Sequence, residues 1–312
     1  MNDEVRPMIY TITFNPSLDY VIQVDHFKSG TINKTTFETL LAGGKGINVS
    51  TVLANLGVDN TALGFLAGFT GKEIERKLNE QGVNTSFIHV KNGLSRINVK
   101  MKSDEETEIN GSGPDIRKED IDTLFDKINQ CQNEDIIVIS GSIPKSLPDT
   151  IYEQIMQNLE GKEVKIVVDA KNSLVVNVLK YKPFLIKPNN YELSEIFNVT
   201  IKSKKDAITY AKKLQAMGAL NVLVSMAGDG AVFVGDNGLI FESDAPKGTV
   251  VNSVGAGDSM VAGFLAKYLE TNDYHQSFVY SICSGSATAF QLGLAKRNDV
   301  ELIKASFLTN KI

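Results

Sequence analysis

The chain has 312 residues, of which 42% are hydrophobic and 22% charged, and this balance predicts a large folded core rather than a disordered or fibrous chain. The formal net charge is −5 and no basic block is present, so we expect no nucleic acid as a partner. No apolar stretch approaches the roughly 20 residues of a membrane span, and the two cysteines, Cys131 and Cys283, have the spacing of neither a zinc site nor a disulfide framework. We therefore expect a cytoplasmic protein that is not bound to a membrane.

The first third of the chain predicts a buried strand followed by pieces of a small sheet. Residues 1–7 are polar and are interpreted as an extension that precedes a buried strand over residues 8–14. Apolar and polar residues alternate over 17–26, and β-rich residues follow over 35–42. Two more alternating stretches within 94–111 predict a hairpin. Together the segments 17–26, 35–42 and 94–111 are expected to form a lid, a small sheet assembled from non-contiguous pieces.

The rest of the chain alternates regularly between strands and helices. Such alternation predicts an α/β fold in which a mainly parallel sheet is covered by helices, and we expect it to form a single domain over residues 8–312. The expected strands cover residues 136–139, 164–168, 184–186, 222–224 and 231–234, and the expected helices cover residues 119–129, 148–158, 174–179, 191–197 and 203–217.

Polar residues follow directly after four of the predicted strands. The four turns contain Ser142, Asp169, Lys187 and Ser225 respectively. Ligands of an open parallel sheet bind at the carboxyl ends of its strands. Any one of these turns is typical of an ordinary loop, but four of them on one edge favour a ligand site there.

The stretch over residues 251–259 combines small residues with one carboxylate. Gly255, Ala256 and Gly257 precede Asp258 and an apolar helical run. Small residues let backbone N–H groups approach an anion, and the helix points its positive end at the same place. This arrangement suits phosphoryl transfer, in which Asp258 would take the proton of an attacking hydroxyl while the amides of Ala256 and Gly257 hold the transferred phosphate. The helix end is expected to keep Asp258 ionised with a low pKa; the alternative is a glycine-rich turn with an N-capping aspartate.

The glycine-rich turn at residues 43–46 lacks the spacing of the Walker A loop and of the dinucleotide fingerprint, which argues against a nicotinamide oxidoreductase. Gly43 and Gly44 would instead let the backbone approach the hydroxyls of a small polyol, with Lys45 and Asn48 as donors. Asp19 would accept hydrogen bonds from two adjacent hydroxyls. The alternatives are a solvated strand residue for Asp19 and a surface lysine for Lys45.

Three further side chains have both a functional and a structural interpretation. Arg96, on the predicted hairpin, would clamp a phosphate with two hydrogen bonds, although exposed strand arginines are common. Asn189 and Glu192 are three residues apart at a helix start, where they would position Mg²⁺ through water. Glu192 is equally explained as a first-turn acid favoured by the helix dipole.

Two glycine motifs carry a family resemblance. With Gly43-Gly44-Lys45-Gly46-x-Asn48 and Gly255-Ala256-Gly257-Asp258, in this order and at this separation, the chain resembles the PfkB (ribokinase-like) carbohydrate kinases over its length from Met8. The resemblance implies a three-layer α/β/α fold with a mainly parallel central sheet and a discontinuous β lid. It also implies ATP and Mg²⁺ as co-substrates and a homodimer formed through the lid, whose strand edges need cover.

Within that family, residues 15–19, 95–100, 105–111 and 252–255 fit the subgroup that phosphorylates D-fructose 1-phosphate at its carbon-6 hydroxyl to give fructose 1,6-bisphosphate. Tagatose 6-phosphate and fructose 6-phosphate are the alternative acceptors. A non-catalytic sugar-phosphate sensor is a second hypothesis, but such a protein would not need Asp258 and the glycines beside it.

The resemblance also implies a role for each residue that matches a family motif. Asp258 would be the catalytic base and Gly255, Ala256 and Gly257 its anion hole, whereas Asn189 and Glu192 would hold Mg²⁺ through water. The implied sugar and sugar-phosphate contacts are Asp19, Gly43, Gly44, Lys45, Asn48, Arg96 and Ser142. The implied nucleotide contacts are Lys187, Ser225, Gly228, Gly230 and Ser286, with Gln291 near the adenine. The turn at 169–173 departs from the family, whose members often carry a small hydroxyl and a glycine there.

Overall fold

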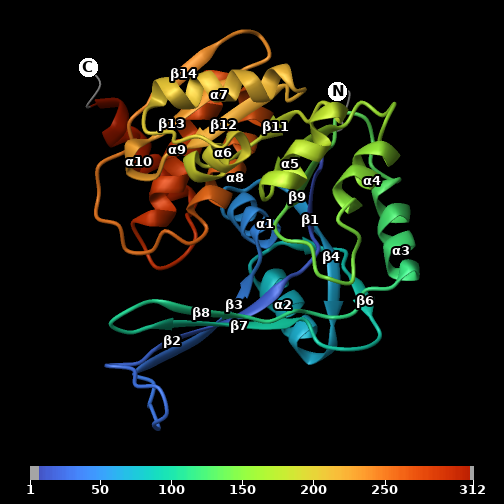
Figure 1. The fold of residues 1–312 in the computed structure, drawn as a ribbon, viewed down its shortest axis with the longest axis vertical. Helices are drawn as coiled ribbons and strands as arrows, with labels where there is room; N and C mark the ends of the chain where they lie inside the picture. The colour runs from blue at the N-terminus through green and yellow to red at the C-terminus, as the bar shows by residue number, and fades with distance from the viewer. Residues whose placement is uncertain (1–6, 310–312) are drawn as a thin grey trace.

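The computed structural model describes residues 7–309, so the extension expected over residues 1–7 lies outside the described chain except for Pro7. The described residues form a ten-stranded, mainly parallel sheet between two layers of helices, together with a separate four-stranded sheet at one end of the molecule (Figure 1). This arrangement confirms the expected α/β fold class and the small second sheet. No described helix has both the length and the apolar character needed to cross a membrane.

The central sheet runs through the middle of the molecule. Its strands are β1 (Ile9–Thr13), β4 (Asn60–Ala67), β5 (Asn84–Thr85), β6 (Ile88–Val90), β9 (Ile136–Ser140), β10 (Lys165–Asp169), β11 (Leu185–Ile186), β12 (Asn221–Ser225), β13 (Ala231–Val234) and β14 (Ile240–Ser243). The order is β14-β13-β12-β11-β10-β9-β1-β4-β5, with β6 paired to β4. All pairs are parallel except β12–β13 and β13–β14. The inner strands are buried on both faces, which is why β9 is a continuous apolar run up to Ser140.

Helices cover both faces of this sheet. One layer contains α3 (Lys118–Ile128), α4 (Ile151–Asn158), α5 (Asn172–Val178), α6 (Asn190–Phe197) and α7 (Lys204–Ala216), and the other contains α1 (Lys45–Asn55), α8 (Ala256–Thr271), α9 (Tyr274–Ala289) and α10 (Arg297–Thr309). Two short 3₁₀ helices are η1 (Leu179–Tyr181) and η2 (Ala227–Asp229). Because successive strand residues point to opposite faces, Val168 packs in the first layer and Val167 in the second.

The lid is the four-stranded sheet with the order β3-β2-β7-β8. Its strands are β2 (Ser17–Gln23), β3 (Phe37–Gly43), β7 (Arg96–Lys102) and β8 (Thr107–Asn110), and the helix α2 (Gly68–Glu80) packs beneath β2 and β3. The register places Ser17 opposite Arg96 and Asp19 opposite Asn98. Residues paired in this way point to the same side of a sheet, so one face of the lid is polar.

The helix α9 and the helix α10 were not predicted from the sequence. Along α9, Ser277, Ser281 and Ser284 are buried together with its apolar residues, so the sequence lacks the apolar stripe that marks a surface helix. Ser277 and Ser284 donate their hydroxyls to carbonyls four residues earlier, which makes their burial tolerable.

Candidate active site

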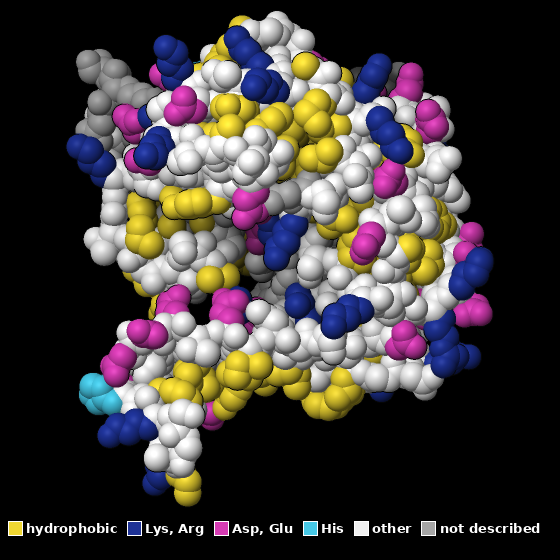
Figure 2. Space-filling model, in the orientation of Figure 1, with side chains coloured by type: hydrophobic (Ala, Val, Ile, Leu, Met, Phe, Trp, Pro, Cys, Tyr) yellow, Lys and Arg dark blue, Asp and Glu magenta, His cyan; other side chains and the backbone are white. Residues whose placement is uncertain are grey.

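A cavity of about 1120 Å³ lies between the lid and the carboxyl ends of the central strands. Four polar residues at the ends of successive strands line it: Ser142 after β9, Asp169 at the end of β10, Lys187 after β11 and Ser225 at the end of β12. Figure 2 shows the hollow between the lid and the body of the molecule, with side chains of both charges at its mouth. The four turns noted in the sequence therefore meet in one place, as a parallel sheet requires.

The helix α8 begins at the wall of this cavity. Its N-cap, Gly255, has a φ of 81°, in the left-handed region that favours glycine, and a Cβ there would come 2.6 Å from Leu294 Cδ2. The Ala256 N–H donates to the Ser253 carbonyl at 3.2 Å. Of the two amides expected to bind an anion, that of Ala256 is thus engaged in a turn, whereas that of Gly257 lies in the first helical turn and has no intrahelical acceptor.

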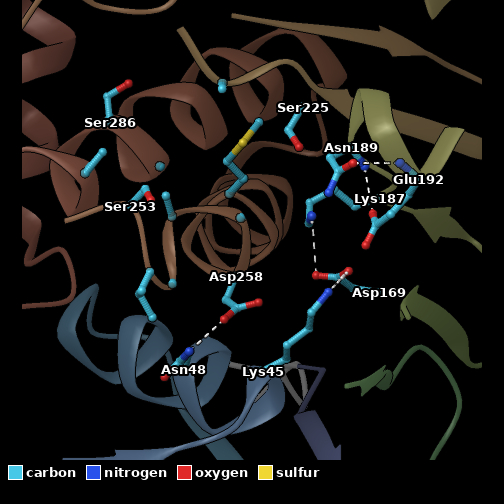
Figure 3. A pocket seen from close by; sticks show the side chains of 18 of the residues that line it. Lys45, Asn48, Asp169, Lys187, Asn189, Glu192, Ser225, Ser253, Asp258 and Ser286 are labelled. Atoms are coloured by element: carbon cyan, nitrogen blue, oxygen red, sulfur yellow. Dashed lines mark hydrogen bonds and ion pairs between the residues drawn. The ribbon is translucent and has the colours of Figure 1, made fainter. Parts of the chain in front are cut away.

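The Asp258 carboxyl is buried and held by one neighbour. Its Oδ2 atom accepts a hydrogen bond of 2.7 Å from Asn48 Nδ2 (Figure 3). Burial and then the Asp169 carboxylate raise the pKa of Asp258 to about 6, against the opposing effects of Lys45, Asn48 and Lys187. The expectation of a low pKa was wrong, because desolvation outweighs the favourable helix end in a buried site. At pH 7 the side chain is still mostly ionised and is a stronger base than an ordinary aspartate.

Asp169 is a site candidate that the sequence did not assign. Its side chain is only 1% exposed, and it faces Lys45 Nζ at 2.8 Å from Oδ1 and Lys187 Nζ at 3.4 Å from Oδ2. Burial disfavours all these charges, but their attraction dominates, so the pKa of Asp169 is lowered and that of Lys45 is raised. Lys45 is therefore an ion-paired residue rather than a surface lysine. The sequence signal that could have identified Asp169 is its position directly after the buried strand expected over residues 164–168.

Asp19 is fixed in place on the polar face of the lid. Its Oδ1 accepts hydrogen bonds from Ser17 Oγ at 2.6 Å and from Asn98 Nδ2 at 3.0 Å, and Lys100 Nζ lies 3.2 Å from Oδ2. The side chain is buried, which excludes the solvated alternative. Gly43 does not line the cavity; it makes room for the carboxylate, since a Cβ at Gly43 would lie 2.5 Å from Asp19 Oδ2.

Two cations on the lid face the cavity. Arg96 donates its Nε–H to the Asn15 carbonyl at 3.0 Å, and this bond leaves its two terminal nitrogens for other partners. Lys100 lies between the carboxylates of Asp19 and Glu108. Arg96 and Lys100 both line the cavity, as does Gly44 at the adjoining turn.

The loop after β12 and the helix α9 line another part of the cavity. Ser225, Gly228, Gly230 and Ser286 all contribute to its wall. Gly230 has a φ of 92°, and a Cβ there would come 1.9 Å from the Ser243 carbonyl oxygen, so this turn requires glycine. Gln291 is not among the lining residues and instead donates to the Leu294 carbonyl and to Asp299.

Asn189 and Glu192 cap the helix α6 reciprocally. Asn189 Oδ1 accepts from the Glu192 N–H at 2.8 Å, and Glu192 Oε2 accepts from the Asn189 N–H at 2.9 Å. The structural interpretation of Glu192 is therefore correct. The cap engages Oε2 of Glu192, and both residues line the cavity, so capping does not exclude a second role.

A family comparison identifies the cavity. The profile of the pfkB family carbohydrate kinases matches residues 12–299, a stretch that contains every cavity residue named above. The chain belongs to the pfkB family. It is therefore a carbohydrate kinase, an enzyme for which ATP is the implied phosphoryl donor.

The names of similar proteins refer to the phosphorylation of ketohexose phosphates. The chain is 45% identical to 1-phosphofructokinase of Bacillus subtilis, with 94% of this chain and 96% of the relative aligned. It is 36% identical to D-tagatose-1-phosphate kinase of Bacillus licheniformis, with 92% and 94% aligned. Phosphofructokinase-2 of Escherichia coli, solved with fructose-6-phosphate and in a tetrameric inhibited form, has 25% identity, a TM-score of 0.89, and coverage of 97% of this chain and 99% of its own.

The pfkB motifs predicted from the sequence meet around this one cavity, although they come from distant parts of the chain. The lining includes Asp19, Gly44, Lys45, Asn48, Arg96, Ser142, Lys187, Asn189, Glu192, Ser225, Gly228, Gly230, Gly255, Ala256, Gly257, Asp258 and Ser286. Two residues expected at the site, Gly43 and Gln291, stay outside the lining. The predicted site lacked several polar lining residues, among them Asp169, Asn98 and Lys100.

Proposed function

We propose that this carbohydrate kinase transfers the γ-phosphoryl group of ATP to the carbon-6 hydroxyl of D-fructose 1-phosphate and releases fructose 1,6-bisphosphate and ADP. The name of the 45% identical relative supports this acceptor. One observation carries the proposal. Asp258, at the start of α8, is buried and hydrogen-bonded to Asn48, and it lines the same cavity as Asp19, Arg96 and Lys100 of the lid. We place the reaction in the cytoplasm, in keeping with the buried thiols of Cys131 and Cys283.

Asp258 acts as the general base in this proposal. Its Oδ2 is oriented by the Asn48 amide, and its pKa of about 6 lets it take the proton of the carbon-6 hydroxyl near neutral pH. The Gly257 amide at the positive end of α8, together with the ammonium groups of Lys45 and Lys187, would stabilise charge on the migrating phosphoryl group. Because the phosphoryl transfer transition state is loose, positioning and charge stabilisation contribute most of the rate.

The lid binds the sugar phosphate in this proposal. Asp19 is anchored by Ser17 and Asn98, so its carboxylate is ready to accept hydrogen bonds from sugar hydroxyls. Arg96 and Lys100 would hold the phosphate on carbon 1, at the far end of the sugar from the carbon-6 hydroxyl. Closing the lid over the sugar would exclude the water that competes for the phosphoryl group.

The remaining cavity residues fit the nucleotide and Mg²⁺. Among the described residues no group of three or more His, Cys, Asp or Glu side chains forms a metal cage. Mg²⁺ does not need one, because it usually binds one or two carboxylates, water and substrate phosphates. We assign Asn189 and Glu192 to hold Mg²⁺ through water, where the ion would neutralise charge on the ATP phosphates. Nucleotide contacts are assigned to Lys187, Ser225, Gly228, Gly230 and Ser286.

A homodimer formed through the lid would cover an apolar surface. On the face of the lid opposite to Asp19, the paired residues Leu40, Tyr20, Val99 and Ile109 form a row across all four strands. Leu40 is 39% exposed and Ile109 65% exposed, and Figure 2 shows apolar side chains along the lid. Size-exclusion chromatography with light scattering should detect a dimer that Ile109→Lys converts to a monomer; a wild-type monomer would contradict this assignment.

Turnover of four sugars tests the proposed acceptor. ADP release should be fastest with fructose 1-phosphate and slower with fructose 6-phosphate and tagatose 6-phosphate. Tagatose 1-phosphate, which differs from fructose 1-phosphate only in its configuration at carbon 4, is the second candidate because of the 36% identical relative. Asp258→Asn should lower kcat by about 10²-fold to 10⁴-fold while ATP binding persists. A faster reaction on another sugar would overturn the acceptor, and near-normal turnover of Asp258→Asn would overturn the base.

A further inference from the structure

A buried carboxylate under the cavity has no part in the chemistry described above. Asp169 ends the strand β10, and its side chain is 1% exposed. Because it belongs to this buried strand, its position is set by the sheet rather than by a mobile loop. Figure 3 shows it between the side chains of Lys45 and Lys187 and beside Asp258.

Asp169 links two lysines that come from separate elements. Lys45 is the first residue of α1, directly after the Gly44 turn, and its Nζ lies 2.8 Å from Oδ1. Lys187 follows β11, and its Nζ lies 3.4 Å from Oδ2. One carboxylate therefore engages one ammonium group with each oxygen, and all three residues line the cavity. Without the carboxylate between them, the two ammonium groups would repel each other and take other rotamers.

The surroundings offer Asp169 little other compensation. In the described residues, Ser140 Oγ and Thr13 Oγ1 are buried without a hydrogen-bond partner, and Asp169 Oδ2 has only the Lys187 ammonium group, 3.4 Å away. The three lie in register at the ends of β10, β9 and β1. Burying a carboxylate is costly, and here the cost is offset by the two lysine ammonium groups alone. Such an arrangement inside a cavity points to a functional constraint rather than to fold stability.

We propose that Asp169 is a positioning residue that holds Lys45 and Lys187 side by side, aimed at the transferred phosphoryl group, without contacting the substrate itself. This inference rests on the proposed function. It also predicts an electrostatic effect on the base, because Asp169 and Asp258 share the same pair of lysines. The Asp169 charge raises the pKa of Asp258, whereas the Lys45 and Lys187 charges lower it.

Asp169→Asn removes the charge and keeps the shape of the side chain. We expect kcat to fall about 10²-fold because both lysines lose their anchor. The acidic limb of the pH profile of kcat/KM reports the pKa of Asp258. This limb should move to lower pH by about 1 pH unit, because one negative charge disappears and two positive charges remain. Ser140→Ala is the matched control, since Ser140 is equally buried, in register with Asp169 and uncharged. It should leave kcat and the limb unchanged.

A second variant keeps the test decisive if Asp169→Asn does not fold. Lys45→Met removes one of the cations that lower the pKa of Asp258, so its acidic limb should move to higher pH, opposite to that of Asp169→Asn. In the double variant, the loss of kcat from Lys45→Met should be smaller than in the wild-type background, since Asp169 acts through Lys45. Circular dichroism and the melting temperature establish folding.

An unchanged acidic limb in folded Asp169→Asn or in Lys45→Met overturns the inference, as do additive effects on kcat in the double variant. A purely structural role for Asp169 would lower the melting temperature and would make the effects of Asp169→Asn and Lys45→Met on kcat additive in the double variant. All measurements use whichever acceptor sugar the wild-type enzyme turns over fastest. A wrong acceptor therefore refutes the proposed function and leaves this test of Asp169 intact.

Discussion

Replacing Gly43 by alanine should damage sugar binding although residue 43 does not line the cavity. The new Cβ would lie 2.5 Å from Asp19 Oδ2 and 2.6 Å from Asp19 Cγ, well inside ordinary contact. The carboxylate cannot swing away freely, because Ser17 and Asn98 bind its Oδ1. It must retreat by about 1 Å, and misplacement of that size in a catalytic site costs about 10²-fold in rate. We expect kcat/KM for the sugar phosphate to fall by about that factor.

The assay is initial-rate ADP release with the sugar phosphate varied at saturating ATP, and then with ATP varied. The loss should appear in kcat/KM for the sugar, while KM for ATP changes little, because Asp19 is assigned to the sugar end of the cavity. Gly293→Ala is the matched control, because a Cβ there would meet nothing within 4 Å, its φ lies outside the left-handed region, and Gly293 does not line the cavity. If Gly43→Ala keeps its kcat/KM for the sugar within threefold of the wild type, the assignment of Asp19 is wrong.

Three further predictions follow from the same geometry. Since the folded pKa of Asp258 (about 6) is raised above the ordinary 3.8, its contribution to the unfolding free energy is complete below pH 3.8 and lost as pH rises through 6. Asp258→Asn should therefore raise the melting temperature at pH 7.5 by a few degrees, at about 2–4 °C per kcal/mol, and a decrease in differential scanning calorimetry would contradict this. In wild-type enzyme, kcat/KM should fall about tenfold per pH unit below pH 6 as Asp258 is protonated; a flat profile down to pH 5 would exclude this base. Asn189→Ala should lower the unfolding free energy measured in urea by about 1 kcal/mol, because α6 loses its N-cap hydrogen bond. Thr150→Ala is the control: Thr150 is the exposed N-cap residue of α4, but its side chain makes no capping hydrogen bond, so the unfolding free energy should change far less.

Several features of the fold could be predicted because they depend on local pattern. The continuous apolar run of β9 predicts a strand buried on both faces, and the alternation around Asp19 predicts a strand with one polar face. The helix α9 escaped prediction, because buried serines interrupt its apolar stripe; two of them, Ser277 and Ser284, donate their hydroxyls to carbonyls within the helix. That arrangement depends on α8 and α10, which pack against α9 and are not visible in its own residues.

The candidate site was only partly predictable. The small residues around Asp258 and the turn at Lys45 have local signatures, since glycines and a helix start imply an anion site. The pKa of Asp258 could not be predicted, because it depends on burial and on Asp169, a residue 89 positions earlier in the chain. The helix end alone suggested the opposite direction.

The sequence by itself determined the main alternation of strands and helices up to α8, the turns that carry polar residues, and the family, because these features are encoded in neighbouring residues. Only the tertiary structure decided which charges meet: Lys45 with Asp169, Asn48 with Asp258, and Gly43 beneath Asp19. The physical reason is that electrostatic energy depends on separation and burial in space. Residues more than a hundred positions apart, such as Lys45 and Asp169, become neighbours only when the sheet aligns the ends of its strands.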